Sequence, residues 1–164
     1  MTRRGAKAAA EGASAARPAE HRLALSLQLE DAGDRALLAH ARVRRWLRAA
    51  LERPAEITLR VVGAAEGLEL NRAWRDQAHA TNVLTFDYAR EPVVQADIVL
   101  CAPVVRREAR AARKTLEAHY AHLVVHGALH AQGWDHVDDA EAEAMEAKER
   151  AALAALGYPD PYGG

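Results

Sequence analysis

Apolar and polar residues alternate along 23–29, where every second position is a leucine. A period of two is that of a β-strand with one buried face. The same alternation recurs over 56–62, and two apolar runs rich in β-forming residues cover 82–88 and 96–101. A turn-like sequence at 90–92 separates these last two runs. The pattern therefore predicts four strands.

Apolar residues at helical spacing occupy much of the remaining chain. In the first such segment Val43, Trp46 and Leu47 share one face. The last segment opens on Asp138 and Glu141, a pair with the spacing of a helix cap, and ends before a glycine. We therefore predict helices over 31–51, 68–75, 103–113, 115–132 and 138–156.

Strands and helices follow one another in mixed order, which favours an α+β fold with one small sheet covered by helices. At 164 residues the chain has room for one domain with a real core. Residues 1–20 are mainly Ala, Gly, Arg and Ser without aliphatic periodicity. We expect a disordered tail over 1–20 and a single domain over 21–164, with a mixed four-stranded sheet and about five helices.

The composition, with 27% charged residues, is that of a soluble globular protein. No apolar run is long enough to span a membrane and no signal-peptide pattern is present, so we expect a cytoplasmic location. The formal net charge of -1 argues against a protein that coats nucleic acid through bulk charge. Cys101 is the only cysteine, so an intrachain disulfide and a thiolate metal cluster are both excluded.

Charge is uneven along the chain. Arginines gather over 42–53 and again over 106–114, whereas 138–149 is strongly acidic. For either basic run taken alone, a solvated helix face is a better explanation than a surface that follows RNA.

The most informative segment is HGALHAQGWDH at 126–136. His126 and His130 are four residues apart, so on a helix they point from the same face. Gly133 can end that helix in a left-handed turn, which lets His136 supply a third imidazole to the same point. Three ligands with an open fourth position are typical of catalytic zinc sites. We predict one zinc ion here, although imidazole also suits nickel, copper and iron.

A histidine-rich surface helix is the alternative explanation, because His119 and His122 precede the motif on the same helix. Apolar residues between the histidines oppose it, since buried imidazoles without partners are costly. His122 could compete as a ligand on spacing, but the position of the turn favours the later three. We expect His119 and His122 to pack or to support the ligands, and Asp135 to be either a carboxylate that supports a ligand or a surface residue.

The spacing of the three histidines is that of the metzincin proteases, apart from one position. Those enzymes carry Glu directly after the first histidine as general base, and here that position is Gly127. A metal would still lower the pKa of a coordinated water towards roughly 7. The site lacks a partner for developing negative charge, which an arginine facing the metal would supply to a phosphodiester. The chemistry therefore favours phosphate esters over peptides.

The segment LEAHYAHLVVHGALHAQGWDHVDDAEAEAMEAKE, with LGYPDPY after it, closely resembles the YbeY family of bacterial metal-dependent endoribonucleases. The segment LNRAWRDQAHATNVLTF is similar to the other motif of that family, an Asn, an Arg and a strand that begins with Thr-Asn or Thr-Asp. The resemblance extends over about 23–162. It implies an α+β fold, one zinc ion on His126, His130 and His136, and cleavage of single-stranded RNA.

The same resemblance implies maturation of the 3′ end of small-subunit rRNA and a part in ribosome quality control. The implied partners are single-stranded rRNA, the small ribosomal subunit or its proteins, and a ribosome-associated GTPase, with no membrane. The functionally critical arginine of the family corresponds to Arg75, which nothing local distinguishes from Arg72. Asn71, Thr81 and Asn82 correspond to residues of the cleft.

The chain departs from the family pattern at Ala80, Ala96, Ala131 and Trp134, where the family usually has Pro, Gly, Leu and Tyr. None of the four is a predicted ligand. Ala96 puts in doubt any backbone conformation that needs glycine there, and Ala80 loosens the loop before the strand. Both changes bear on the shape of the cleft more than on its chemistry.

Two other functions stay open on the sequence. A metalloprotease or other metallohydrolase fits the ligand spacing but needs a base in place of Glu. A non-catalytic ribosome-biogenesis factor would use zinc to hold its fold, against which the count of three ligands argues. With aromatic residues at 5%, platforms for stacking bases are few, so we expect weak intrinsic RNA affinity and help from a ribosomal partner.

Overall fold

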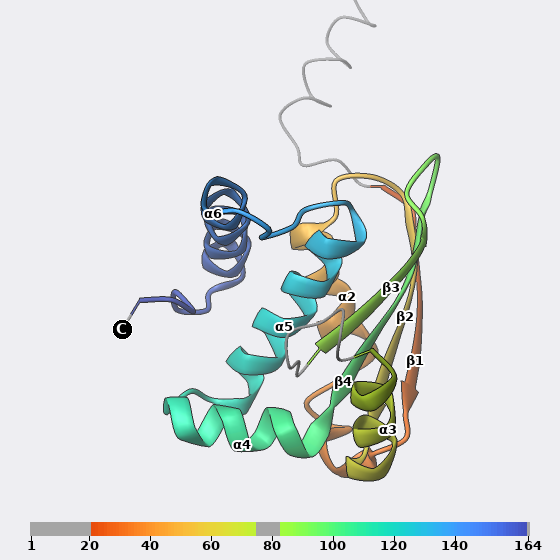
Figure 1. The fold of residues 1–164 in the computed structure, drawn as a ribbon, viewed down its shortest axis with the longest axis vertical. Helices are drawn as coiled ribbons and strands as arrows, with labels where there is room; N and C mark the ends of the chain where they lie inside the picture. Colours follow the sequence, from red (N-terminus) through yellow and green to blue (C-terminus); the bar gives the residue numbers. More distant parts are fainter. Residues whose placement is uncertain (1–20, 75–82, 164) are drawn as a thin grey trace, which may run out of the picture.

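The computed structural model describes residues 21–74 and 83–163, which form a four-stranded sheet and five α-helices (Figure 1). The strands are β1 (Leu23–Leu29), β2 (Ala55–Val62), β3 (Val83–Ala89) and β4 (Val94–Cys101). Their order in the sheet is β1-β2-β4-β3. β1, β2 and β4 run parallel, and β3 pairs antiparallel with β4. The predicted α+β class with a mixed four-stranded sheet is therefore confirmed.

Helices cover the sheet in two layers. They are α2 (His40–Ala50), α3 (Ala64–Trp74), α4 (Ala102–Ala112), α5 (Leu116–Ala131) and α6 (Asp139–Leu156). α5 packs against β3 and β4, α2 packs against β1 and α5, and α6 lies on α2 and α5 away from the sheet (Figure 1). In the described part of the chain, no helix is long and apolar enough to cross a membrane.

The first long helix begins at His40, later than the predicted start at residue 31. Asp31 accepts a hydrogen bond from the backbone N–H of Gly33 at 3.0 Å, which closes a local turn. Asp31 and Asp34 also form ion pairs with Arg106 of α4 at 2.9 and 3.0 Å. These contacts hold 32–34 in a short 3-10 turn, so the helix forms only after them.

Two other elements begin earlier than predicted because of their neighbours. β4 starts at Val94, since the parallel ladder with β2 continues from Ala55 opposite Val94. α3 starts at Ala64 and lies close to the end of β4. A Cβ atom at Gly67 would approach the Sγ atom of Cys101 to 2.5 Å, so only glycine permits this approach. Cys101 itself is half-buried.

Side chains of α2 cover the free edge of β1. The Arg22 carbonyl accepts the N–H of Ala55 in β2 at 2.9 Å, so the alternate carbonyls point to the open edge. Three side chains at every fourth position of α2 donate to those carbonyls: His40 Nε2 to Leu25 at 3.2 Å, Arg44 Nη1 to Leu23 at 2.8 Å and Arg48 Nη1 to His21 at 2.8 Å. An edge occupied in this way is protected from pairing with another strand.

Candidate metal centre

α5 carries two of the predicted ligands on the face that it turns away from the sheet. The side chain of Thr115 caps the helix by accepting the N–H of Ala118 at 3.1 Å. The opposite side of α5 is buried between the sheet and α2, and includes Tyr120, Val124 and Ala128. His126 and His130 are four residues apart and half-buried, so burial of the apolar face fixes where the imidazoles point.

The end of α5 forms the turn that the sequence predicts. Gly133 has a φ of +102°, in the left-handed region. Its N–H donates to the carbonyl of His130 at 2.9 Å, and the N–H of Trp134 donates to that of Leu129 at 3.1 Å. This pair of hydrogen bonds is the Schellman motif, which reverses the chain after a helix. His136 follows three residues later beside the two helical imidazoles.

The three histidines come together. One nitrogen from each of His126, His130 and His136 lies within 4.8 Å of the others, and the ring centroids are 4.7 to 5.9 Å apart. A tetrahedral zinc ion with bonds of about 2.0–2.1 Å holds its nitrogens roughly 3.4 Å apart. Small side-chain rotations therefore bring these nitrogens to one ion. Because His136 is exposed, the site opens to the surface.

The electrostatics of the cluster suit a metal. Burial, together with the neighbouring His126 and His136, lowers the pKa of the His130 imidazole to about 4. That ring is therefore neutral at pH 7, which is the form that binds a metal ion. Three imidazoles, with no thiolate or carboxylate among the clustered groups of the described residues, fit zinc with an open position.

A buried carboxylate supports one of the three histidines. Glu149 of α6 is 0% exposed and accepts a hydrogen bond from Nδ1 of His126. It also accepts hydrogen bonds from Nε2 of His122 at 3.1 Å and from the hydroxyl of Tyr162. Burial raises the pKa of the Glu149 carboxyl, but these hydrogen bonds outweigh it and bring the pKa to about 2. The carboxylate is therefore ionised at neutral pH.

Sequence reasoning did not single out Glu149 or Tyr162. Glu149 belongs to an acidic run, and such runs usually face solvent. Its signal is its position, because it lies on the buried stripe of α6 together with Met145 and Leu153. An acidic residue at helical spacing with apolar core positions is a candidate for a buried pair. Tyr162 has no comparable local signal.

His119 and Asp135 contact other groups. His119 is buried, and its Nε2 donates to Glu108 of α4 at 3.0 Å. The Oδ1 atom of Asp135 accepts the backbone N–H of His136 at 2.7 Å but lies 3.8 Å from the Nδ1 atom of that ring. The second distance is too long for a hydrogen bond. Asp135 therefore fixes the backbone at the third histidine.

Arg75, Thr81 and Asn82 lie outside the described residues, as does the departure at Ala80. Asn71 belongs to α3, but its side chain is not described.

The other departures from the family pattern are accommodated. Ala96 pairs with Ile57 and Asp87, next to the register shift of β3 between Asp87 and Ala89, and its φ is not positive, so no conformation that needs glycine occurs there. Ala131 is fully buried at the end of α5. The Nζ atom of Lys148 lies 4.8 Å from the centre of the Trp134 ring, which indicates a cation–π contact.

Gly127 faces the sheet. A Cβ atom at this position would lie 3.0 to 3.3 Å from three side-chain carbons of Ile98 in β4. In the sequence, this glycine stands where the metzincins carry their catalytic base. Glutamate here would instead be directed into the apolar contact between α5 and β4, where an unpaired carboxylate is costly. A larger residue at this position would therefore need Ile98 to move by a few tenths of an ångström.

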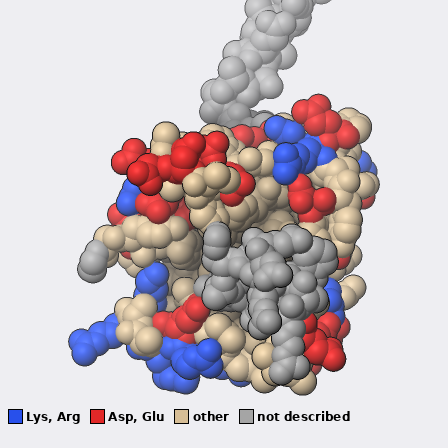
Figure 2. All heavy atoms as spheres, in the orientation of Figure 1, with Lys and Arg blue, Asp and Glu red and all other residues tan. Residues whose placement is uncertain are grey.

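Most arginines of α4 and of its C-terminal cap are exposed. We call Arg107, Arg110 and Arg113 the α4 basic face. All three are exposed and form no side-chain hydrogen bond or ion pair within 21–74 and 83–163. Figure 2 shows basic side chains along the lower part of the molecule, where α4 lies, and acidic ones around the start of α6.

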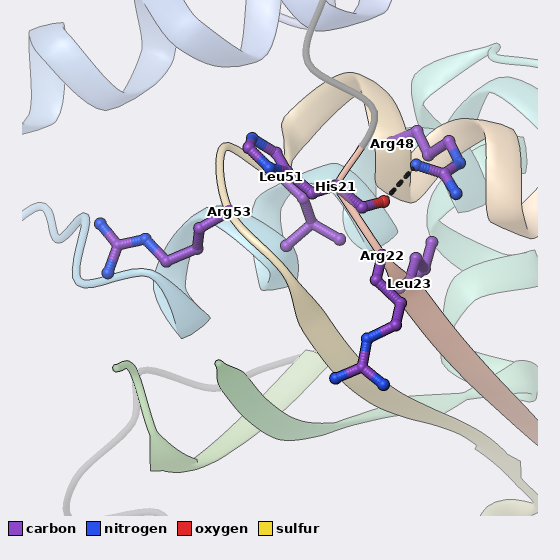
Figure 3. Close-up of a pocket in the computed structure, with 6 residues that line it drawn as sticks. All are labelled: His21, Arg22, Leu23, Arg48, Leu51 and Arg53. Carbon is purple, nitrogen blue, oxygen red and sulfur yellow. Dashed lines mark hydrogen bonds between the residues drawn. The ribbon is translucent and has the colours of Figure 1, made fainter. Parts of the chain in front are cut away.

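A small pocket at the start of β1 is the other place where arginines gather. It is lined by His21, Arg22, Leu23, Arg48, Leu51 and Arg53 (Figure 3). The guanidinium groups of the three arginines point in different directions, and Arg48 donates to the carbonyl of His21. They do not converge on a common point, so the pocket lacks the geometry of an anion site.

Comparisons with known proteins extend over most of the chain. A family model described as Endoribonuclease YbeY matches residues 28–157. A protein named Endoribonuclease YbeY from Methylibium petroleiphilum is 64% identical over 146 residues, covering 89% of this chain and 98% of that protein. A relative of the same name from Acidovorax sp. is 58% identical over 147 residues, covering 87% of this chain and 97% of that protein.

A solved structure has a similar fold. The solution structure of TM1509 from Thermotoga maritima aligns with a TM-score of 0.52 at 23% identity. The alignment covers 85% of this chain and 99% of that one. At this identity the match supports the fold alone.

Proposed function

The chain belongs to the YbeY family of endoribonucleases, and on that premise we propose a zinc-dependent, single-strand-specific enzyme that matures the 3′ end of small-subunit rRNA. Membership confirms the resemblance predicted from the two motifs. It also makes the chain a hydrolase that acts on RNA. The zinc requirement, the single-strand preference and the processing step are the proposal.

One observation carries the proposal: three imidazoles converge at the end of α5, on a side that is open to the surface. When bound, zinc would supply Lewis acidity, which lowers the pKa of water to about 7 and polarises a phosphoryl oxygen. His126, His130 and His136 would hold it. The lowered pKa of His130 keeps that ring deprotonated and ready to bind over the whole neutral range.

Arg75 supplies the second half of the proposed site. A phosphodiester is negatively charged in its ground state and gains charge at the transition state, and a guanidinium pairs with phosphate oxygens through two parallel hydrogen bonds. The residue follows α3 directly and corresponds to the critical arginine of the family motif. We assign it contact with the scissile phosphate.

The α4 basic face is the proposed guide for the RNA strand. α4 meets the start of α5, where His119 contacts Glu108. Since an α-helix rises about 1.5 Å per residue, His126 lies roughly 10 Å along α5 from that contact. A strand held at the metal site can therefore reach α4 within a few nucleotides. Free guanidinium groups bind the backbone without regard to sequence.

The cellular setting is also part of the proposal. Few aromatic side chains are available to stack bases, since aromatic residues make up 5% of the chain. Weak intrinsic RNA affinity would be supplemented by the small ribosomal subunit, its proteins or a ribosome-associated GTPase. We propose a cytoplasmic enzyme that also takes part in ribosome quality control.

Cleavage of single-stranded rRNA by the purified chain tests the proposal. We expect activity to be lost after chelation and restored by zinc, and to fall by at least about 100-fold in His126→Ala. Arg75→Ala should lose a similar amount while retaining zinc. His40→Ala and Arg44→Ala are matched controls, because they remove the same side-chain types from the α2 contacts with β1, outside the proposed site.

Three outcomes would contradict the proposal. Unchanged cleavage in His126→Ala or Arg75→Ala would exclude the assigned site. RNA binding that persists without metal, in a chain that unfolds on chelation and does not cleave, would favour a non-catalytic zinc protein. Turnover of peptides that is lost on chelation would favour a metalloprotease or other metallohydrolase. The packing of Gly127 against Ile98 argues against the protease, because position 127 does not present a base to the metal.

A further inference from the structure

Glu149 needs an explanation beyond folding. It is completely buried, whereas carboxylates are rarely fully buried unless they are paired. The same stripe of α6 holds Met145 and Leu153, so an apolar side chain would fill this place without the cost of removing a charge from water. Glu149 does not belong to the cluster of predicted metal ligands, but it contacts one of them, His126.

The contact with Glu149 determines which ring nitrogen of His126 carries hydrogen. The two carboxylate oxygens of Glu149 face three groups that can donate hydrogen bonds to them, two imidazole nitrogens and one hydroxyl. Oε2 of Glu149 therefore accepts a hydrogen bond from Nδ1–H of His126. Oε1 accepts hydrogen bonds from Nε2–H of His122 and from the hydroxyl of Tyr162. A neutral His126 with hydrogen on Nδ1 has its lone pair on Nε2. The carboxylate thus decides which nitrogen is left for a metal.

The chain after α6 completes this arrangement. Figure 1 shows it leaving the lower end of α6 and running outwards to the C-terminus. Lys114 Nζ donates to the carbonyl of Pro161 at 3.2 Å, and Arg150 pairs with Asp160 at 3.2 Å. The Arg150 guanidinium also lies 5.4 Å from the centre of the Tyr162 ring. These contacts hold the tyrosine hydroxyl against the buried carboxylate.

We propose that Glu149, held by Tyr162, is a positioning residue that fixes His126 in the tautomer and orientation that present Nε2 to the metal. The inference rests on the metal site of the proposed function. A carboxylate that accepts the second N–H of a ligating imidazole orients the ring and raises its basicity, and its loss typically weakens metal binding 10- to 100-fold. The C-terminal segment is thereby part of the metal centre.

Zinc affinity and the His126 tautomer are the two readouts. In the full chain, Glu149→Gln should weaken zinc binding by about 10- to 100-fold in competition with a chromophoric chelator. Nitrogen-15 NMR of the metal-free wild type at pH 8 should show hydrogen on Nδ1 of His126. In Glu149→Gln the hydrogen should move at least partly to Nε2, because the amide can donate to Nδ1.

Two further variants separate positioning from folding. Tyr162→Phe removes one donor to Glu149 and should weaken zinc binding about 3- to 10-fold, which is less than the loss of the carboxylate. It also keeps the proposal testable if Glu149→Gln does not fold. Glu108→Gln is the matched control, since it breaks the same kind of Glu–His contact at His119 of the same helix. Its zinc affinity should equal that of the wild type.

The inference is overturned if metal-free wild type carries its hydrogen on Nε2 of His126. It is also overturned if Tyr162→Phe and Glu149→Gln bind zinc as tightly as Glu108→Gln. A purely structural role would lower stability without moving the tautomer. A zinc-loaded wild type that cleaves no RNA would contradict the proposed function instead, and would leave the tautomer and affinity results to decide this inference.

Discussion

α2 and α4 carry similar numbers of arginines, but the two helices use them differently. Arg44 and Arg48 of α2 donate to main-chain carbonyls of β1 and its approach, each at 2.8 Å. Arg107 and Arg110 of α4 are exposed and have no such acceptors within the described residues. A guanidinium that donates to the carbonyls of a strand edge contributes to folding, whereas an exposed guanidinium without such an acceptor is available to a polyanion.

The difference depends on what lies opposite each helix. α2 packs beside an edge strand whose alternate carbonyls repeat along it, and side chains at every fourth helical position reach them in turn. Within 21–74 and 83–163, one arginine of α4 has partners: Arg106, which faces Asp31 and Asp34. Basic runs of the same composition can therefore serve stability or binding, and only the acceptors distinguish them.

The largest effect is expected on RNA binding. Replacing Arg107 and Arg110 by glutamine should weaken binding of single-stranded RNA about 10-fold at low salt, and should lower the salt slope by roughly 1.4. The variant Arg44→Gln/Arg48→Gln changes net charge by the same amount and should retain the wild-type slope. Equal losses in both variants, measured by fluorescence anisotropy across a salt series, would erase the proposed difference.

The next largest effect is on stability, and here the α2 variant is the one expected to change. Arg44→Gln/Arg48→Gln should lower the free energy of unfolding by about 1–2 kcal/mol, because carbonyls at the β1 edge lose their donors. Urea unfolding measures the loss, with Arg107→Gln/Arg110→Gln as the matched control that should stay within about 0.5 kcal/mol of wild type. Light scattering should also detect more self-association through the exposed edge. A destabilised α4 variant beside an unaffected α2 variant would reverse our interpretation.

A third, smaller effect sharpens the contrast within α4. Arg113 has a φ of +58°, and such a left-handed conformation is unfavourable for an L-residue, whereas α6 ends with Gly157 at φ +91°. Arg113→Gly should raise the free energy of unfolding by about 0.5–1 kcal/mol and still reduce the salt slope of RNA binding by roughly 0.7. Thermal unfolding and salt titration of this one variant measure both. A stability gain without any change in RNA binding would remove Arg113 from the α4 basic face.

The smallest effect concerns the inward arginine of α4. The backbone N–H of Gly33, together with Arg106, holds the pKa of the Asp31 carboxyl below its usual range. The unfolded chain therefore takes up the proton first, so this contribution is present above about pH 3.9 and is lost as pH falls through the folded pKa. Arg106→Gln should lose stability less steeply than wild type in that acid range, by urea unfolding at several pH values. Parallel curves would show that the pair is screened.

Local patterns predicted most of the fold and the clustered histidines. α5 and α6 follow from periodicity and caps, since Asp138 accepts the N–H of Glu141 at 2.8 Å as its spacing predicts. The convergence of His126, His130 and His136 also depends only on one helix and the turn after it. Such features need few partners from distant parts of the chain.

The features that the sequence did not predict depend on distant partners. The late start of α2 follows from ion pairs of Arg106 with residues more than 70 positions earlier. Glu149 contacts His126, 23 residues before it, and Tyr162, 13 residues after it. Composition makes this glutamate look like its solvated neighbours, and only the packing of α6 on α5 separates them. The same holds for Arg44 and Arg48 of α2, whose carbonyl partners are set by the course of β1.

The contact between Gly127 and Ile98 bears on how such a site could evolve. A single substitution at position 127 would recreate the histidine and glutamate spacing of a metzincin, yet the new side chain would meet the sheet and never the metal. Exchange between the two activities would need a different packing of α5 against the sheet as well as a different residue at position 127. Similar histidine spacings on different scaffolds are therefore separated by a change in architecture, and a motif match alone overstates their kinship.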